Sequence, residues 1–293
     1  MTFSRRVLLK LCPTIVGSLA FVYFSISSLT KYDFSSFAIT LIIPTIAYII
    51  AHCLRAIRLG VLLKAQKIRK LLSLHFYTAA CSAVIPFKLG ELVRINEVSR
   101  WKKNYCKGIL IVWIERIFDV IALSILALLI FISGGAQVLE GMWGLLWIML
   151  AFVFFSIVMF FILPEQLSAL NLHVIRSYSG RKAIKILHLL DIISSILEKV
   201  RPIVSERILT LSILTIFIWI FELVSLMLFL DHTQIIPIVK DLLAQFSFVL
   251  TDSPKSIVQL ITIDAVKNTL LIIFGFVSIF FYMQMYYKNK RNK

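Results

Sequence analysis

Three charged residues share one face of a predicted helix. Glu91, Arg94 and Glu97 are spaced at i, i+3 and i+6, so neighbouring members can form ion pairs within the helix. Lys88 precedes them by one turn. A guanidinium matches the geometry of a phosphate, and a carboxylate can bind a cationic group or hold an arginine in place. The group could therefore bind a charged substrate.

A second charged set lies within an apolar run at 108–132. Glu115, Arg116 and Asp119 interrupt this run, and Glu115 and Asp119 are one helical turn apart. A charge inside a membrane-spanning helix costs roughly 2.5–3.5 kcal/mol and usually faces a protein interior or a wet cavity. We therefore expect the two charged sets to be buried together. The sequence leaves open whether they form a structural network of ion pairs, bind a substrate, or do both.

Two further apolar runs carry isolated charges. Glu222 lies near the middle of the run 207–230, so it needs a partner or a proton. Arg116 and Lys267 are the candidate partners. Lys267 itself lies one turn from Asp264 near the C-terminus.

Common catalytic signatures are absent from the sequence. The five histidines lack metal-ligand spacing, and no G-x-S-x-G, Walker, H-E-x-x-H or D-x-D motif is present. We therefore predict no catalytic residue, no metal and no cofactor. An integral membrane transferase that uses Glu91 or Asp119 as a base remains an alternative. The four cysteines form no C-x-x-C pair, which favours buried structural thiols.

The elements that carry these residues are predicted to be membrane-spanning helices. Of the 293 residues, 60% are hydrophobic and 16% are charged, against about half and a quarter in a soluble domain. The apolar residues come in runs long enough to cross a bilayer. The sequence thus predicts an all-α integral membrane protein, a single polytopic domain over 1–293, with about six spanning helices. These are 8–29, 37–59, 108–132, 142–163, 207–230 and 257–287.

Basic residues alternate between the connections and predict the orientation. Lys and Arg number six in 55–70, six in 88–107 and seven in 164–207, but one in 30–36 and none in 133–141. Positive connections remain cytoplasmic, which predicts cytoplasmic N- and C-termini and residence in the cytoplasmic membrane. The formal charge of +16 then indicates anionic lipid headgroups as partners, not nucleic acid.

Residues 71–100 do not fit a simple count of spans. The apolar part of this segment has basic residues on both flanks, so a single crossing would place one basic cluster outside. A re-entrant helical hairpin that turns between Pro86 and Gly90 avoids this problem. The alternative is a pair of helices lying on the membrane surface. Residues 235–256 could form a second re-entrant element.

The connection at 181–201 is predicted to be an amphipathic helix. Its apolar residues recur at helical spacing, with lysines largely elsewhere. The helix is expected to lie on the cytoplasmic leaflet. Packing against the protein's own cytoplasmic face is the alternative.

The order of motifs resembles a known family. Pro86, Gly90, Glu91 and Arg94 precede a basic linker, and a helix with Glu115, Arg116 and Asp119 follows it. This pattern is similar to the lysylphosphatidylglycerol synthase transmembrane family, also called flippase-like membrane proteins. The second Pro- and Gly-rich turn typical of that family lacks its glycines here. No soluble aminoacyl-transfer domain is expected, so the synthase activity is not carried over.

The resemblance implies that the protein binds and translocates a phospholipid or a lipid-linked product between leaflets. The alternative is an accessory subunit for a membrane enzyme that modifies envelope lipid or glycan. The candidate substrate-binding residues are Lys88, Glu91, Arg94, Glu115, Arg116, Asp119 and Glu222.

Overall fold

A computed structural model describes most of the helical part of the chain. It covers residues 34–65, 67–84, 90–132, 143–177, 206–230 and 266–279, with 184, 186–188, 190, 191, 194 and 239. Within these residues the regular structure is helical and contains no strand, which confirms the all-α class. Lys88, the predicted span 8–29 and nearly all of 235–256 lie outside the described residues.

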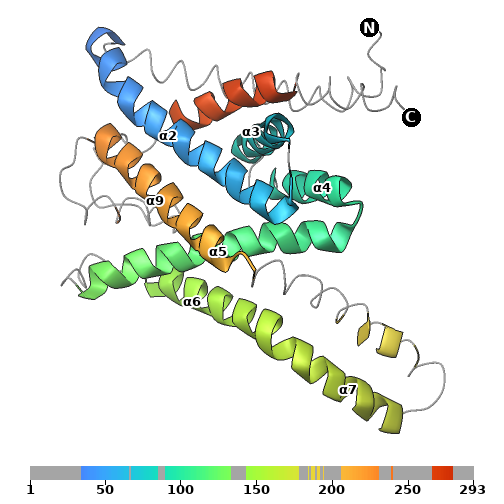
Figure 1. The fold of residues 1–293 in the computed structure, drawn as a ribbon. Coiled ribbons are helices and arrows are strands. Elements are labelled where there is room, and N and C mark those ends of the chain that lie inside the picture. Colours follow the sequence, from blue (N-terminus) through green and yellow to red (C-terminus); the bar gives the residue numbers. More distant parts are fainter. Residues whose placement is uncertain are drawn as a thin grey trace, which may run out of the picture.

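The described helices account for most of the predicted apolar runs (Figure 1). Three stretches are long and apolar enough to cross a membrane: Ile42–Leu63, Trp143–Phe160 and Ile208–Phe229. The number of spans remains a prediction. In chain order the helices are α2 (Phe34–Leu63), α3 (Ile68–Val84), α4 (Gly90–Lys102), α5 (Tyr105–Ile132), α6 (Trp143–Ile157), α7 (Leu163–Ser177), α9 (Ile208–Leu230) and a helix at Val266–Ile279.

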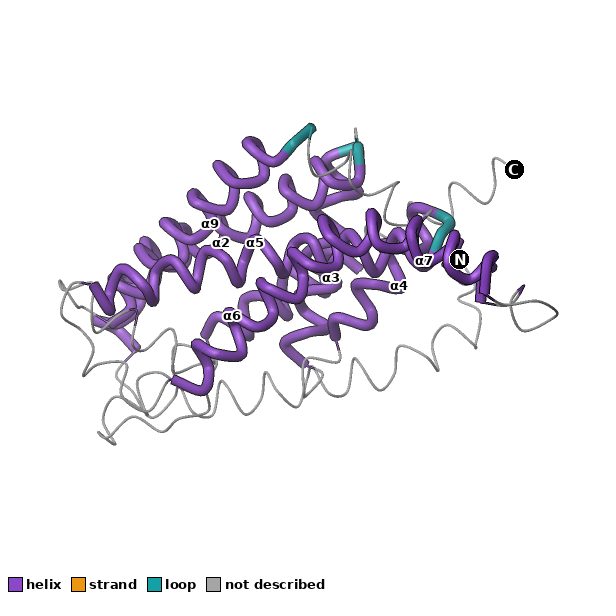
Figure 2. Tube along the Cα trace, turned by 90° about the horizontal axis from the view of Figure 1, so that it is seen from below, coloured by secondary structure: helices purple, strands orange, loops and turns teal. Residues whose placement is uncertain are grey.

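The helices α2 and α9 pack along each other in opposite directions, and α5 crosses them (Figures 1 and 2). Arg58 near the end of α2 meets Thr215 near the start of α9. At the opposite end, the Ser225 hydroxyl donates to the carbonyl of Pro44 at 2.9 Å. Pro44 lies inside α2. The helices α3 and α5 pack against this pair.

The helix α4 lies between α3 and α5 and approaches both closely. A Cβ atom placed on Gly90 would come within 2.7 Å of the carbonyl carbon of Cys81 and even closer to the backbone of Ser82. A Cβ on Gly108 would come within 2.8 Å of Ser99 Cα. The two glycines therefore allow the backbones of three consecutive helices to touch.

The segment predicted as a re-entrant hairpin is a pair of antiparallel helices. At 1.5 Å per residue, the 17 residues of α3 and the 13 residues of α4 are about 25 Å and 20 Å long, less than the roughly 30 Å of a bilayer core. The start of α3 lies close to the end of α4, as the 4.3 Å distance from Lys70 Nζ to the centre of the Trp101 ring shows. The geometry suits entry and exit on one side. Its placement in a membrane remains a prediction.

The turn between α4 and α5 is fixed by local hydrogen bonds. Lys103 adopts a positive φ of 52°, and its N–H donates to Arg100 while the N–H of Asn104 donates to Ser99. This is the Schellman arrangement that ends a helix. The Asn104 side chain then accepts the N–H of Lys107 at 3.1 Å and caps the start of α5. These bonds set the register of α4 against α5.

Basic side chains stabilise the C-terminal end of α2. Lys102 Nζ donates to the carbonyl of Leu63 at 2.7 Å, and Arg207 donates to the carbonyl of Val61. The last carbonyls of a helix lack partners and carry partial negative charge, so cations are favourable there. Burial, and then neighbouring basic side chains, lower the pKa of Lys102. This densely positive end agrees with the predicted cytoplasmic side.

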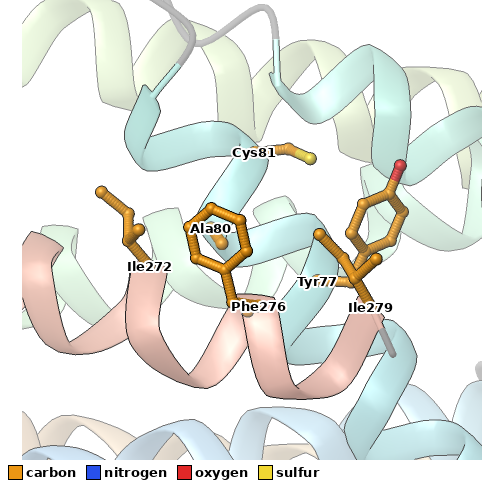
Figure 3. Close-up of a pocket in the computed structure, with 7 residues that line it drawn as sticks. Tyr77, Ala80, Cys81, Ile272, Phe276 and Ile279 are labelled. Carbon is orange, nitrogen blue, oxygen red and sulfur yellow. The ribbon is translucent and has the colours of Figure 1, made fainter. Parts of the chain in front are cut away.

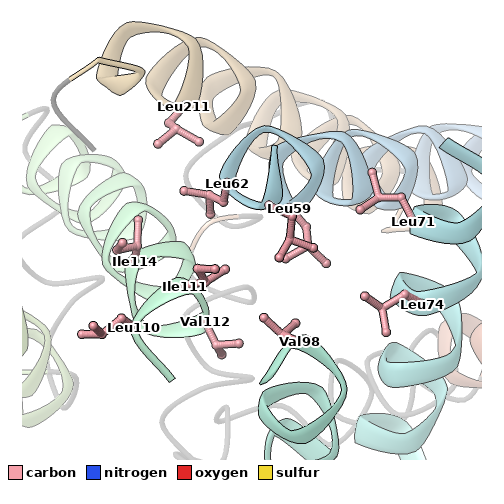
Figure 4. Close-up of a cluster of buried hydrophobic side chains, with 11 residues drawn as sticks. Leu59, Leu62, Leu71, Leu74, Val98, Leu110, Ile111, Val112, Ile114 and Leu211 are labelled. Atoms are coloured by element: carbon pink, nitrogen blue, oxygen red, sulfur yellow. The ribbon is translucent and has the colours of Figure 1, made fainter. Parts of the chain in front are cut away.

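An apolar cluster fills the space between these helices at the same end (Figure 4). It joins α2, α3, α4, α5 and α9, and therefore fixes the position of both charged helices. Its members are Leu59, Leu62, Leu63, Leu71, Leu74, Val98, Leu110, Ile111, Val112, Ile114 and Leu211.

The candidate membrane span Trp143–Phe160 agrees with the predicted run 142–163, but the helix does not end there. A π-helical turn at Val158–Ile162 follows α6 and leads directly into α7. The N–H of Leu163 bonds the carbonyl of Val158, five residues back. Pro164 would clash with a regular α-helical turn, and the wider turn removes that clash. The helix therefore continues to Ser177.

The described residues of 181–201 are helical. Leu190 is buried against Leu167 and Val174 of α7, whereas Ile184 is exposed. Part of the apolar face is thus covered by the protein itself.

Candidate functional site

Two ion pairs join α4 to α5, as the sequence led us to expect. Arg94 Nη2 lies 2.9 and 2.8 Å from the two carboxylate oxygens of Glu115. Arg116 Nη2 lies 2.6 Å from Glu91 Oε1. The antiparallel register set by the turn between these helices brings both pairs into contact.

A third ion pair connects α5 to α2. Arg58 Nη1 lies 2.8 Å from Asp119 Oδ1, without hydrogen-bond geometry, and donates to Thr215 Oγ1 at 3.0 Å. Asp119 also lies 3.4 Å from Arg116. The carboxylate of Asp119 therefore sits between two arginines.

Glu222 has two cationic partners. Arg55 Nη2 lies 3.0 Å from its Oε2, and Lys267 Nζ lies 3.4 Å from its Oε1. Of the two partners that the sequence suggested, Lys267 is correct. Arg116 is wrong, because it pairs with Glu91 and Asp119 instead.

These contacts form what we call the charge network. It consists of five cations and four anions within the described residues: Arg55, Arg58, Arg94, Arg116, Lys267, Glu91, Glu115, Asp119 and Glu222. One continuous chain of contacts runs from Arg58 through Asp119 and Arg116 to Glu91. It links α2, α5 and α4.

Members of the charge network differ in their access to the surroundings. The side chains of Arg94 and Glu115 are 7% and 1% exposed, and that of Arg58 is 2% exposed. In contrast, Arg116 and Glu91 are 43% and 28% exposed. The network therefore has a buried interior and one open pair.

Two histidines form a polar contact beside the charge network. His52 Nδ1 of α2 lies 3.1 Å from His75 Nε2 of α3, and both rings are buried. Arg55 Nη1 lies 3.4 Å from His52 Nε2. Among the described residues, no group of three or more His, Cys, Asp or Glu could hold a metal ion.

Several polar atoms of the site are buried and have no hydrogen-bond partner among the described residues. They include the Nε atoms of three arginines, each of which has a partner at one Nη or at both. They are Arg58 Nε, Arg94 Nε, Arg116 Nε, His75 Nδ1, Glu91 Oε2, Asp119 Oδ1 and Glu222 Oε2, of which the last two still form ion pairs. Unsatisfied buried groups are rare and indicate strain, function or a missing small partner.

Arg55 and Arg58 are site residues that the sequence reasoning missed. Both lie inside the predicted span 37–59 but were counted only as basic residues of 55–70, and the structure places both in α2. Their spacing from His52, at i+3 and i+6 on one helix face, is the signal that could have identified them. The remaining connection is still basic.

The described residues also line a small cavity between α3 and the helix at Val266–Ile279 (Figure 3). Its walls include Ala80, Ile272 and Phe276, and no charged side chain lines it. This cavity therefore offers no ion-pair partner to a charged group.

Apolar helices that are long enough to cross a membrane and that enclose ion pairs define a helical membrane protein. The chain belongs to the family described as the lysylphosphatidylglycerol synthase TM region, whose model matches residues 11–282. The family is a membrane domain associated with lipid modification or flipping. Searches of curated proteins and of solved structures each gave no match.

Proposed function

We propose that the protein binds the headgroup of a phospholipid or lipid-linked product and moves it between the leaflets of the cytoplasmic membrane. The observation that carries this proposal is the half-exposed Arg116, paired with Glu91 at the edge of a charge network whose other members are less exposed. The distribution of basic residues supports a cytoplasmic location for both termini.

Arg116 is the best residue in the charge network to meet a phosphate. Its side chain is 43% exposed, and its Nε has no partner among the described residues. An ion pair this open contributes about 0–1 kcal/mol, so a phosphate could replace Glu91 on the guanidinium at small cost. A planar fork of donors suits that exchange.

Arg94 suits a structural role instead. Its Nη2 contacts both oxygens of Glu115, and both side chains are buried. Removing one partner of such a pair leaves a buried charge and costs roughly 3–5 kcal/mol. Arg94 thus holds α4 against α5 while the neighbouring Arg116 exchanges partners.

Glu91 completes the exchange. Its Oε2 is buried and has no partner among the described residues, while its Oε1 contacts Arg116. When a phosphate occupies Arg116, the carboxylate of Glu91 becomes free to meet a cationic part of the headgroup. Glu91 lies in the first turn of α4, next to the turn of the hairpin. Helices that break within the bilayer and line a polar path are a known device of transporters.

The test is a leaflet-resolved assay in proteoliposomes with fluorescent phosphatidylglycerol. Arg116→Ala is expected to accumulate as folded protein, since Asp119 keeps Arg58, but to lose most translocation. Arg116→Lys is expected to restore only part of it. Arg100→Ala is the matched control, because Arg100 lies on the same hairpin and is 68% exposed.

Normal translocation by folded Arg116→Ala would refute the role of Arg116. Wild-type protein that binds phosphatidylglycerol but leaves its leaflet distribution unchanged would favour an accessory subunit of a membrane enzyme.

A further inference from the structure

Two cations share the carboxylate of Glu222 and contact it in different ways. Lys267 Nζ donates a hydrogen bond to Glu222 Oε1 at 3.4 Å. Arg55 Nη2 lies 3.0 Å from Glu222 Oε2 without hydrogen-bond geometry, and this oxygen is buried with no hydrogen-bond partner among the described residues. The carboxylate therefore keeps a hydrogen-bonded cation when Arg55 turns to another anion.

The group of Arg55, Glu222 and Lys267, which we call the triad, carries the excess charge of the network. Elsewhere in the charge network three arginines meet three carboxylates, whereas in the triad one carboxylate meets two cations. Lys267 also lies 5.2 Å from the centre of the Tyr48 ring. Within the described residues, the triad can thus accept one anion without leaving any buried charge unpaired.

Arg55 is oriented by a neighbour and is partly open. Its Nη1 lies 3.4 Å from Nε2 of His52 in the same helix, while its Nη2 faces Glu222. The side chain of Arg55 is 21% exposed. Apart from the open Arg116, the other cations of the charge network are only 2–7% exposed. A guanidinium that is fixed and accessible suits a phosphate.

The triad extends the charge network away from the predicted cytoplasmic side. Asp119 meets Arg58 in α2, and Arg55 lies one helical turn further from the C-terminal end of α2, which the basic residues predict to be cytoplasmic. Glu222 is about 12 Å from the opposite end of α9, since eight residues separate it from Leu230. A headgroup bound at the triad would therefore be closer to the outer leaflet.

We propose that Arg55 is a second site for a headgroup phosphate, reached after the open pair Arg116–Glu91 on the way to the outer leaflet. The inference rests on the proposed function and deepens it. The phosphate binds Nη2 of Arg55 in place of Glu222, and Glu222 remains with Lys267. His52 is a positioning residue that holds the guanidinium.

The direct test is thermal unfolding of the full chain in dodecyl maltoside with phosphatidylglycerol, phosphatidylcholine or inorganic phosphate added. The Arg116→Ala variant is used, so that the first site does not contribute. A ligand that binds only the folded protein raises its Tm, and we expect phosphatidylglycerol to raise it more than phosphatidylcholine does. Adding Arg55→Gln should remove this difference. The control Arg176→Gln, at the exposed end of α7, should leave it unchanged.

Inorganic phosphate distinguishes the two sources of the anion. A Tm shift with phosphatidylglycerol but not with inorganic phosphate assigns a lipid headgroup to the site. A shift with inorganic phosphate alone, removed by Arg55→Gln, supports the phosphate site and assigns free phosphate as its ligand.

Two single variants test the charge argument. Arg55→Gln and Lys267→Gln each leave Glu222 with one cation, so both should accumulate as folded protein, as measured by size exclusion. Arg55→Gln should slow phosphatidylglycerol translocation about tenfold or more, as for a lost hydrogen bond to a charged group. Lys267→Gln leaves Arg55 as the sole partner of Glu222. Release of Arg55 would then leave a buried carboxylate unpaired, so adding Lys267→Gln to Arg116→Ala should also abolish the Tm difference.

The second site is overturned if the Tm of Arg116→Ala responds to neither phosphatidylglycerol nor inorganic phosphate, or if the response survives Arg55→Gln. If Arg55→Gln does not fold, an unchanged response in Lys267→Gln overturns the site instead. If Arg116→Ala still abolishes translocation in these cases, the proposed function stands without the second site. If wild-type protein moves no lipid at all, the proposed function fails, and the Tm shifts still decide whether Arg55 binds a phosphate.

Discussion

The buried ion pair between Arg94 and Glu115 provides the sharpest test of how the fold is held. Replacing Glu115 by glutamine keeps the shape of the side chain but leaves the Arg94 cation buried without a counter-charge. Arg94 Nη2 contacts both carboxylate oxygens at 2.8–2.9 Å, and the side chains are 7% and 1% exposed. Breaking such a pair costs roughly 3–5 kcal/mol, and the amide retains part of the hydrogen bonding, so we expect about 3 kcal/mol.

The assay is unfolding of the purified protein in mixed micelles of dodecyl maltoside and dodecyl sulfate. Arg100→Gln is the matched control, because the Arg100–Glu97 pair is the same type of contact but Arg100 is 68% exposed. We expect it to lose about 1 kcal/mol or less. The double variant Arg94→Met with Glu115→Met removes both charges and should recover most of the stability.

The reasoning fails if Glu115→Gln unfolds no more easily than Arg100→Gln. It also fails if the double methionine variant is less stable than either single methionine variant. In that case the pair would stabilise the fold by direct attraction, and not merely by avoiding an unpaired charge.

Three further predictions concern the hairpin and its surroundings. Gly108→Ala should lower the folded fraction, because the added Cβ meets the backbone of α4. The control Gly144→Ala, where nothing lies within 4 Å of the added Cβ, should be neutral or stabilising by up to about 1 kcal/mol. Equal thermal stabilities of the two variants would contradict the close packing of α4 on α5. Lys102→Met should destabilise by about 0.3–1 kcal/mol, as measured by thermal unfolding, since the last carbonyl of α2 loses its cation; no loss would show that water replaces it. Single cysteines at Arg69 and Lys103, in an otherwise cysteine-free protein, should both react with an impermeant maleimide from the cytoplasmic side only, and labelling from opposite sides would refute the hairpin.

The sequence predicted the arrangement of α3, α4 and α5 because strong local signals coincide there. The basic flanks of 71–100, the break near Gly90 and the charges within α5 each restrict the chain, and they agree. The continuation of α6 into α7 was missed for a physical reason. Pro164 normally ends a helix, and the π turn that permits it is a feature of the backbone at Val158–Ile162, which leaves no clear pattern in the sequence.

The missed arginines show a different limit. Basic residues at the end of an apolar run usually mark the membrane surface, so Arg55 and Arg58 were counted as topology signals. Their true role depends on partners far along the chain, Glu222 and Asp119. Such pairing is decided by how α2 packs on α9 and α5. The spacing from His52 could have placed both arginines on one helix face, but no local pattern reveals which acidic residues they meet.

The balance of the charge network bears directly on how a headgroup could cross. Within the described residues, five cations face four anions, so nearly every charge is matched inside the protein. A headgroup phosphate that enters at Arg116 replaces one carboxylate by another anion on the same guanidinium, and Glu91 is released toward the cationic part of the lipid. Because partners are exchanged and not separated, no unpaired charge needs to enter the hydrocarbon.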